Sequence, residues 1–309
     1  MRYRRAVLIY NPAARHVKAS VIESAAAALQ RHVACLETIP TAGPGSGVHI
    51  ARQACASAVD LIVACGGDGT INEIINGMAG AAAPLAVIPA GTANVFALET
   101  GLPLDPNAAA CLLPDLVPRR IGLGLVRREG PPPCSRYFLL MSGVGLDAHI
   151  IYRLNPRWKK RFGEVAYWAA GLFEFGRRRH PFEISLEGRT YECTFALASR
   201  SRLYGGGLQI ARRSHLLDAS LDIVLFHTRC RWRYARYLAD VLTGRLDRSK
   251  DVTFAEARRI EARIVERADV RIEVDGEYAG RLPASIEVVE DAITLLLPAA
   301  FIREDQAEL

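Results

Sequence analysis

The chain lacks the patterns that mark several large classes of protein. No stretch of its 309 residues approaches the roughly 20 consecutive apolar residues that a transmembrane helix needs. Its seven cysteines are scattered and form no C-x-x-C pair, which argues against a disulfide framework and a zinc site. Since Met1–Arg5 leads straight into a short apolar strand, with no signal-type apolar region, we expect a cytoplasmic protein.

The bulk composition predicts a globular protein with a mild basic excess. Half of the residues are hydrophobic, so the chain can bury sizeable cores over one large domain or two ordinary ones. The formal net charge is +6 and the pI is near 9.0. A basic excess of this size suits nucleotides, anionic membrane surfaces or nucleic acid, and does not choose among them.

The most informative stretch is 61–78. An apolar run ends in Gly66-Gly67-Asp68-Gly69-Thr70, and a helical pattern follows at once. This strand, glycine loop and helix are the local architecture that binds phosphate, with glycines expected to take positive φ and to bring the backbone close. Asp68 would hold Mg²⁺, orient a basic residue or take part in phosphoryl transfer. The alternative is a tight turn in which Asp68 and Thr70 only cap the helix.

The first 125 or so residues alternate between strands and helices. Expected strands are 6–10, 33–38, 61–64 and 85–88, each followed by a loop and a helix. Repeated βα units predict a parallel sheet with helices on both faces, and ligands bind at the carboxyl ends of such strands. Asn11 and Asn94 follow strands and share that edge with Asp68, which favours nucleotide contact over simple capping. Glu73, one turn into its helix, either contacts nucleotide or complements the helix dipole.

After the loop 129–133 the pattern changes to short β-type runs. These predict an antiparallel sandwich or barrel-like domain. The expected strands are 137–141, 182–186, 191–197, 221–226, 270–274, 285–289 and 292–297, interrupted by helical patterns at 162–177 and 232–242. The segment 150–182 is basic and aromatic, so it is either a membrane-surface helix or a packed helix with a solvated basic face.

Several motifs in this order and spacing resemble the diacylglycerol kinase/sphingosine kinase family of lipid kinases. The resemblance covers nearly the whole chain. Its motifs are Asn11-Pro12, Thr41 before a glycine loop, Gly66-Gly67-Asp68-Gly69-Thr70 with Glu73, Gly91-Thr92-Ala93-Asn94 with Ala97, Gly101 and Pro103, Gly205-Gly206-Gly207 through Asp218 and Leu221-Asp222, and Val274-Asp275-Gly276-Glu277.

The resemblance implies two domains with catalysis between them. Residues 1–125, joined by the tail 298–309, would form an α/β nucleotide-binding domain similar to phosphofructokinase and NAD kinase. Residues 126–297 would form a β-rich lipid-substrate domain. ATP and Mg²⁺ are the implied cofactors. The implied nucleotide-binding residues are Asn11, Thr41, Gly66, Gly67, Asp68, Gly69, Thr70, Glu73, Gly91, Thr92 and Asn94; Asp275 is the implied general base, Glu277 assists it, and Asp218 belongs to a Mg²⁺-binding loop.

The implied partner is a lipid substrate, reached by peripheral contact with the inner face of the membrane. No nucleic-acid module is visible, so we expect no nucleic-acid partner. A homodimer is compatible with the sequence, which does not decide the oligomeric state. Diacylglycerol, a sphingoid base, ceramide, phosphatidylglycerol or an isoprenoid alcohol would each suit as acceptor, and a diacylglycerol-like lipid is favoured.

Three alternatives stay open at this point. Asp275-Gly276 reads independently as a type I′ hairpin turn, which needs no catalysis. NAD kinases and phosphofructokinases also use a G-G-D-G core, although the second glycine signature argues against them. Many relatives carry Asp at the positions of Val95 and Gly122, so a nucleotide- or lipid-binding homologue with weakened catalysis is the third interpretation.

Overall fold

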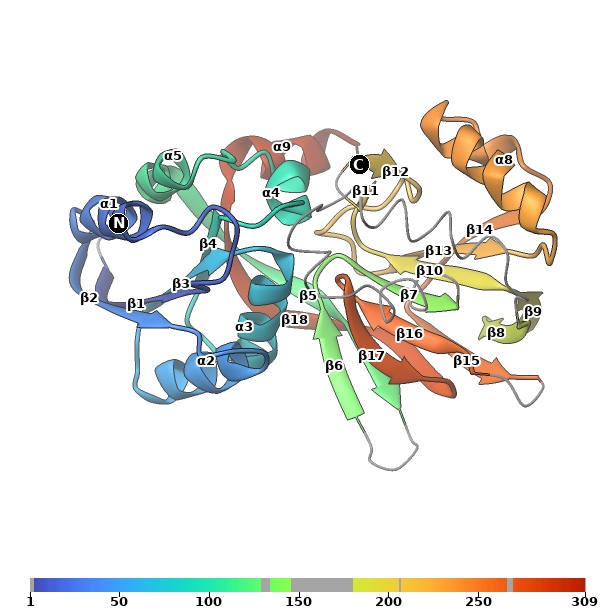
Figure 1. The fold of residues 1–309 in the computed structure, drawn as a ribbon, viewed down its shortest axis with the longest axis horizontal. Helices are drawn as coiled ribbons and strands as arrows, with labels where there is room; N and C mark the ends of the chain where they lie inside the picture. The colour runs from blue at the N-terminus through green and yellow to red at the C-terminus, as the bar shows by residue number, and fades with distance from the viewer. Residues whose placement is uncertain (1–2, 129–133, 146–179, 206, 266–268, 309) are drawn as a thin grey trace. The chain divides into compact units, whose positions relative to one another are not determined.

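The computed structural model describes residues 3–128, 134–145, 180–205, 207–265 and 269–308 (Figure 1). The chain forms two compact units, the first from 1–123 with 290–309 and the second from 124–289. The predicted helix 162–177 and nearly all of the basic segment 150–182 lie outside the described residues. Within the described part, no helix is both long enough and apolar enough to cross a bilayer.

The first unit is built on a parallel sheet. Its strands in sheet order are β2 (Val33–Pro40), β1 (Tyr3–Tyr10), β3 (Leu61–Gly66), β4 (Leu85–Pro89) and the last part of β18 (Ala284–Pro298). All neighbouring pairs among them run parallel, and β18 joins β4 through Leu295 opposite Leu85. β3 and β4 are buried along their whole length, as expected for strands covered on both faces.

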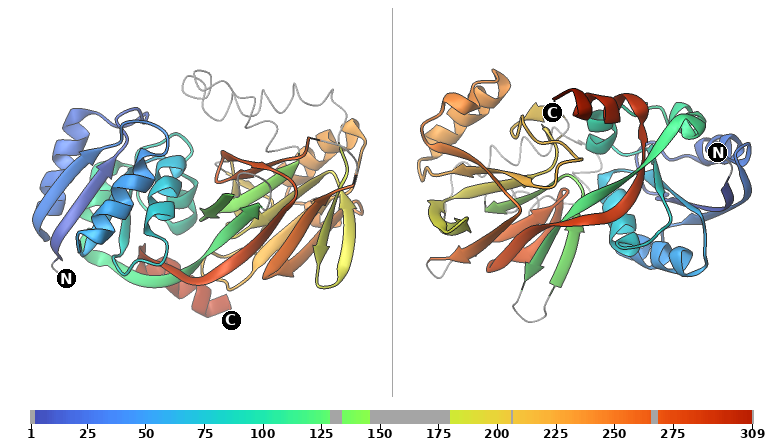
Figure 2. Two further views of the ribbon diagram at one scale, coloured as in Figure 1. Left: turned by 90° about the horizontal axis from the view of Figure 1, so that it is seen from below. Right: turned by 180° about the vertical axis from the view of Figure 1, so that it is seen from behind.

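Helices cover both faces of this sheet. α1 (Ala19–Gln30) packs against α5 (Pro106–Cys111), whereas α2 (Ser46–Ala56) packs against α3 (Asp68–Met78), so the two pairs form separate layers (Figures 1 and 2). α3 buries Ile71, Ile74 and Ile75, the apolar stripe expected from the sequence. The short α4 (Val95–Thr100) follows β4, and α9 (Ala299–Glu308) ends the chain.

The second unit is an antiparallel β-sandwich. One sheet runs β14 (Val252–Ala257), β13 (Leu221–Phe226), β10 (Phe195–Ser199), β7 (Met141–Gly145), β16 (Arg271–Val274) and β17 (Glu277–Arg281). The other contains the first part of β18, β15 (Arg259–Ile264), β8 (Phe182–Leu186) and β9 (Arg189–Cys193), and β5 (Leu116–Arg128) pairs with β6 (Cys134–Phe138). Smaller elements are β11 (Leu203–Tyr204), β12 (Leu208–Gln209) and α8 (Arg231–Leu242).

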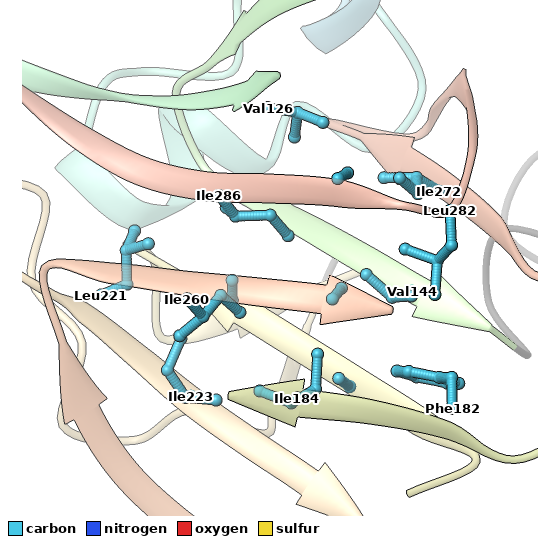
Figure 3. Close-up of a cluster of buried hydrophobic side chains, with 14 of the residues drawn as sticks. Val126, Val144, Phe182, Ile184, Leu221, Ile223, Ile260, Ile272, Leu282 and Ile286 are labelled. Carbon is cyan, nitrogen blue, oxygen red and sulfur yellow. The ribbon is translucent and has the colours of Figure 1, made fainter. Parts of the chain in front are cut away.

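A continuous apolar core lies between the two sheets. Figure 3 shows side chains from both sheets pointing toward one another, among them Val144, Ile223 and Ile272 from the six-stranded sheet and Ile184 and Ile260 from the other. This interdigitation is what stabilises a sandwich. The predicted fold class, an α/β unit with a parallel sheet followed by a β-sandwich, is therefore confirmed.

Three predicted strand assignments are wrong in an informative way. The expected strand 191–197 is two strands, β9 and β10, with a break at Thr194. The expected strand 137–141 is two strands, β6 and β7, with a break at Leu139 and Leu140. The expected strands 285–289 and 292–297 are one strand, β18, whose first part belongs to the second unit and whose last part belongs to the first. Residues 137–141 are apolar throughout, and Glu290-Asp291 interrupts the apolar residues of 285–297, so the sequence pattern located neither the break before β7 nor the continuity of β18.

A buried arginine stabilises the turn before β13. Arg200 is 1 % exposed, and its guanidinium donates hydrogen bonds to the carbonyl oxygens of Leu216 at 2.5 Å and Asp218 at 3.2 Å. Burial lowers the pKa of Arg200 to about 10, an effect partly opposed by the negative charge of Asp218. The group therefore stays protonated at neutral pH. The carbonyl oxygens of Leu216 and Asp218 therefore both accept hydrogen bonds from one buried cation, Arg200.

We expect Arg200→Met to lower the free energy of unfolding by roughly 2–4 kcal/mol, because it removes the guanidinium that donates to the carbonyl oxygens of Leu216 and Asp218. Urea unfolding of the purified protein measures this loss. Arg263→Met is the matched control, since that arginine is exposed and its loss should change stability by less than about 1 kcal/mol. Equal stability of the two variants would contradict the role given to Arg200.

Candidate functional site

The turn between β3 and α3 is much shorter than the sequence suggests. β3 ends at Gly66 and α3 begins at Asp68, so Gly67 alone joins them. Gly67 has φ −92° and ψ −179°, an extended conformation that any residue adopts. Gly66, Gly69 and Gly91 are likewise absent from the residues with positive φ. The expectation that these glycines supply positive φ is therefore wrong.

These glycines instead allow close approach between two turns. A Cβ on Gly91 would lie 2.4 Å from Cα of Gly67, and a Cβ on Gly66 would lie 2.7 Å from the Thr70 side chain. The N–H of Ala90 also donates to the carbonyl oxygen of Gly66 at 2.8 Å. The turns that follow the adjacent strands β3 and β4 thus touch through their backbones.

Asp68 links the same two turns through its carboxylate. Its Oδ2 accepts a hydrogen bond from the Val95 N–H at 3.1 Å, and its Oδ1 accepts one from the Phe96 N–H at 3.2 Å. These are the first amides of α4, which have no acceptor within their own helix. Asn94 precedes them with φ 48°, and its Oδ1 accepts from the Gly91 N–H at 2.8 Å. Asp68 therefore caps a neighbouring helix as well as standing at the start of its own.

The Glu73 carboxylate, in the same way, links α3 to the backbone at the start of α2. Its two carboxylate oxygens accept hydrogen bonds from the Gly45 N–H at 2.7 Å and the Gly47 N–H at 2.9 Å. A Cβ on Gly47 would lie 2.8 Å from Glu73 Oε2, so the glycine makes room for the carboxylate. Glu73 thereby complements the N-terminus of α2, whereas the sequence had suggested its own helix.

The remaining predicted nucleotide residues lie at the carboxyl ends of the same strands. Asn11 follows β1, and its Nδ2 donates to Thr70 Oγ1 at 3.2 Å. Thr41 follows β2, is buried, and donates its N–H to the Tyr10 carbonyl oxygen at 2.8 Å. Thr92 is exposed in the turn after β4. All of the residues singled out in this unit therefore gather at one edge of one sheet.

In the second unit, Asp275 occupies a hairpin turn but directs its carboxylate inward. Asp275 has φ 47° and Gly276 has φ 79°, in agreement with the type I′ interpretation. The side chain, however, is only 9 % exposed. It accepts hydrogen bonds from three consecutive amides, Leu139 at 2.8 Å, Leu140 at 2.9 Å and Met141 at 3.0 Å. These are the amides at the break between β6 and β7.

Two glutamates flank this turn. Glu277 is half-buried at the start of β17. Glu273 on β16 is almost completely buried, and its Oε2 accepts a hydrogen bond from the Gly276 N–H at 2.8 Å. The sequence analysis missed Glu273, which lies in β16 two residues before Asp275. Glu273 thus supports the turn that positions Asp275.

Asp218 lies in the hydrogen-bonded turn that precedes β13. Its Oδ2 accepts a hydrogen bond from the His215 N–H at 2.9 Å, and Arg200 donates to its carbonyl oxygen. Nearby Asp222 accepts from Ser214 Oγ at 2.9 Å, and burial is the main cause that raises its pKa. Over the described residues, no group of three His, Cys, Asp or Glu is placed to hold a metal ion.

Comparisons with known proteins match both units. The sequence model of the diacylglycerol kinase catalytic domain matches residues 5–126, and that of the YegS C-terminal NAD kinase beta sandwich-like domain matches residues 141–297. A diacylglycerol kinase of Mycobacterium tuberculosis is 32% identical over 82% of this chain and 83% of its own length. A diacylglycerol kinase of Bacillus subtilis is 28% identical over 96% of this chain and 97% of its own.

A solved structure supports the fold. A diacylglycerol kinase structure from Bacillus anthracis superposes with a TM-score of 0.77 at 23% identity, covering 97% of this chain and 99% of that one. The glycine turns, the sandwich and these matches lead to one assignment. The chain belongs to the diacylglycerol kinase family of lipid kinases.

Proposed function

We propose that this protein transfers the γ-phosphoryl group of ATP to the hydroxyl group of a diacylglycerol-like lipid. The observation that carries the proposal is the meeting of two glycine turns at the ends of β3 and β4, tied together by the Asp68 carboxylate. The family implies ATP as phosphate donor. The choice of acceptor rests on the matching relatives that are named diacylglycerol kinases.

On the donor side, the start of α3 supplies the positive end of a helix dipole at the edge where the strands end. Asp68 and Glu73 act as positioning residues, because their carboxylates hold the neighbouring turns through backbone amides. Asn11, Thr41, Thr70, Thr92 and Asn94 would contact the nucleotide from those turns. The charge of the transferring phosphoryl group is neutralised mainly by positioned donors and cations.

Mg²⁺ is proposed to arrive at the site together with ATP. Magnesium usually keeps several waters and binds one or two carboxylates together with substrate phosphates. Asp218 is the carboxylate proposed to approach it, and Mg²⁺ would supply charge neutralisation at the phosphates.

On the acceptor side, Asp275 is proposed as the general base, assisted by Glu277. The lipid hydroxyl would give its proton to the Asp275 carboxylate as its oxygen forms a bond to the γ-phosphorus, while the bond from that phosphorus to the bridging oxygen breaks and ADP leaves. The three amides that donate hydrogen bonds to the Asp275 carboxylate fix its direction. A base with fixed orientation lowers the entropic cost of the reaction.

Incubation of the full chain with labelled ATP, Mg²⁺ and mixed micelles tests the function. The acceptor set is a diacylglycerol, a sphingoid base, ceramide, phosphatidylglycerol, an isoprenoid alcohol, NAD and a sugar phosphate. We expect labelled phosphatidate from diacylglycerol as the main product. Preferred labelling of NAD or of a sugar phosphate would overturn the proposal, as would folded protein that labels none of the lipids.

We expect Asp275→Asn to lower kcat by about 10²–10⁴-fold, because the amide cannot accept the hydroxyl proton. Asparagine tolerates the left-handed conformation at this position. Asp291→Asn is the matched control, since Asp291 also has a positive φ of 48° but lies exposed in β18. Steady-state kinetics are measured well below the melting temperatures of both variants, and ATP binding is measured by calorimetry. Together these measurements separate a slower chemical step from a loss of folded protein. A kcat near wild type for Asp275→Asn would contradict the assigned role.

We expect Asp68→Asn to weaken ATP binding by about tenfold, because an amide offers a single acceptor to the two α4 amides and displaces the second turn. Asp60→Asn is the control. Asp60 likewise accepts two consecutive backbone amides, those of Arg4 at 2.8 Å and Arg5 at 2.9 Å, before β3 begins. Both variants should lose stability, but ATP affinity measured by calorimetry should fall only for Asp68→Asn. Equal ATP affinities would argue against the role of Asp68.

A further inference from the structure

Helix α8 has one face that packs against the sandwich and one that meets solvent. Tyr234, Tyr237 and Val241 are buried. Trp232 is 72% exposed and Leu242 is 67% exposed, the two highest values among the large hydrophobic residues of the described chain. At 3.6 residues per turn, Trp232, exposed Ala239 and Leu242 fall within about 80° of one another around the helix, away from the buried residues.

The buried face holds α8 firmly in place. The ring of Phe226 on β13 lies 6.3 Å from that of Tyr234 and 5.2 Å from that of Tyr237, and the two tyrosine rings lie 5.3 Å apart. The Tyr234 hydroxyl also hydrogen-bonds Thr194 Oγ1 at 2.8 Å. Figure 1 shows α8 along the β13–β14 side of the sandwich. The exposure of Trp232 and Leu242 is therefore a property of an anchored helix.

The sequence around the same helix is strongly basic. The segment 229–250 contains seven arginines and lysines and two aspartates, a net charge of +5. Arg229 pairs with Glu192 at 2.7 Å, Arg236 approaches Asp240 at 3.7 Å, and Arg233 pairs with Asp251. The three arginine side chains remain more than half exposed in these pairs, so they can still attract anions.

This combination of groups matches an anionic bilayer. Tryptophan prefers the headgroup region, where its apolar ring and its N–H are both accommodated. Leu242, near the other end of the exposed face of α8, adds apolar contact with the bilayer. Each nearby arginine is attracted to an anionic surface. A nucleic acid would also use arginine and an aromatic ring, but an exposed leucine on the stripe gives it no advantage.

We propose that the exposed face of α8 docks this protein on anionic phospholipid bilayers, with Trp232 and Leu242 entering the headgroup region and Arg233 and Arg236 contacting lipid phosphates. The proposal deepens the proposed function, on which it rests, because a diacylglycerol-like acceptor resides in a bilayer. It assigns recruitment to described residues 229–250, whereas the sequence had suggested 150–182.

The test is co-sedimentation of the full chain with vesicles of phosphatidylcholine alone and of phosphatidylcholine mixed with phosphatidylglycerol, without ATP. We expect binding to the mixed vesicles that weakens with added salt. The double variants Trp232→Ala with Leu242→Ala, and Arg233→Gln with Arg236→Gln, should each bind about tenfold more weakly. Phe254→Ala and Arg259→Gln with Arg263→Gln are matched controls on other exposed parts of the same unit and should bind like wild type.

Insertion of Trp232 has its own measurement. The chain has three tryptophans, so Trp158→Phe with Trp168→Phe leaves Trp232 as the sole reporter. Its fluorescence should shift to the blue on mixed vesicles and be quenched by lipids brominated in the acyl chain near the headgroup. Emission that is unchanged while the protein sediments with vesicles would overturn the proposal, as would equal vesicle binding by the α8 variants and wild type.

A parallel assay separates this proposal from the proposed function. Phosphorylation of a short-chain, water-dispersed diacylglycerol should be unaffected by the α8 variants, because none of these residues belongs to the proposed catalytic machinery. Wild-type protein that phosphorylates this acceptor but ignores anionic vesicles would end the docking proposal alone. Vesicle binding through α8 without any lipid phosphorylation would end the proposed function alone. Preferential binding of RNA over vesicles through α8 would also overturn the docking proposal.

Discussion

Backbone amides that would otherwise be left without acceptors are satisfied by carboxylates from distant segments of the chain. Asp68 accepts the first amides of α4, Glu73 accepts amides at the start of α2, and Asp275 accepts the three amides between β6 and β7. A polar group that loses such a partner costs about 1–3 kcal/mol. Each carboxylate therefore fixes a turn at a geometry that no local interaction would impose.

This arrangement gives a structural role to the acidic residues beside the proposed nucleotide site. A bare carboxylate beside a triphosphate would repel it, but Asp68 and Glu73 direct their charge at helix N-termini to either side of α3. The family's glycine signatures then serve two needs at once. They bring the turns of Gly67 and Gly91 into backbone contact, and they leave room for Glu73 beside Gly47.

The sequence predicted where the turns lie but not the contacts that hold them in place. The alternation of strands and helices predicted the parallel sheet, and Asp275-Gly276 predicted the hairpin, because both signals are local. The role of Gly91 depends on a distance to another turn, and the inward direction of Asp275 depends on a strand break at Leu139. Arg200 carries no sequence signal either, since an arginine between β10 and β11 looks like any surface residue. Contacts between distant segments decide each of these features.

Residue-resolved amide hydrogen exchange tests the central claim most directly. The account predicts that the amides of Val95 and Phe96, and those of residues 139–141, exchange slowly in the protein without ligand. It also predicts that Asp68→Asn accelerates exchange of the first pair while leaving the second group unchanged. Exchange of Val95 and Phe96 as fast as that of an exposed loop in the wild-type protein would contradict the account.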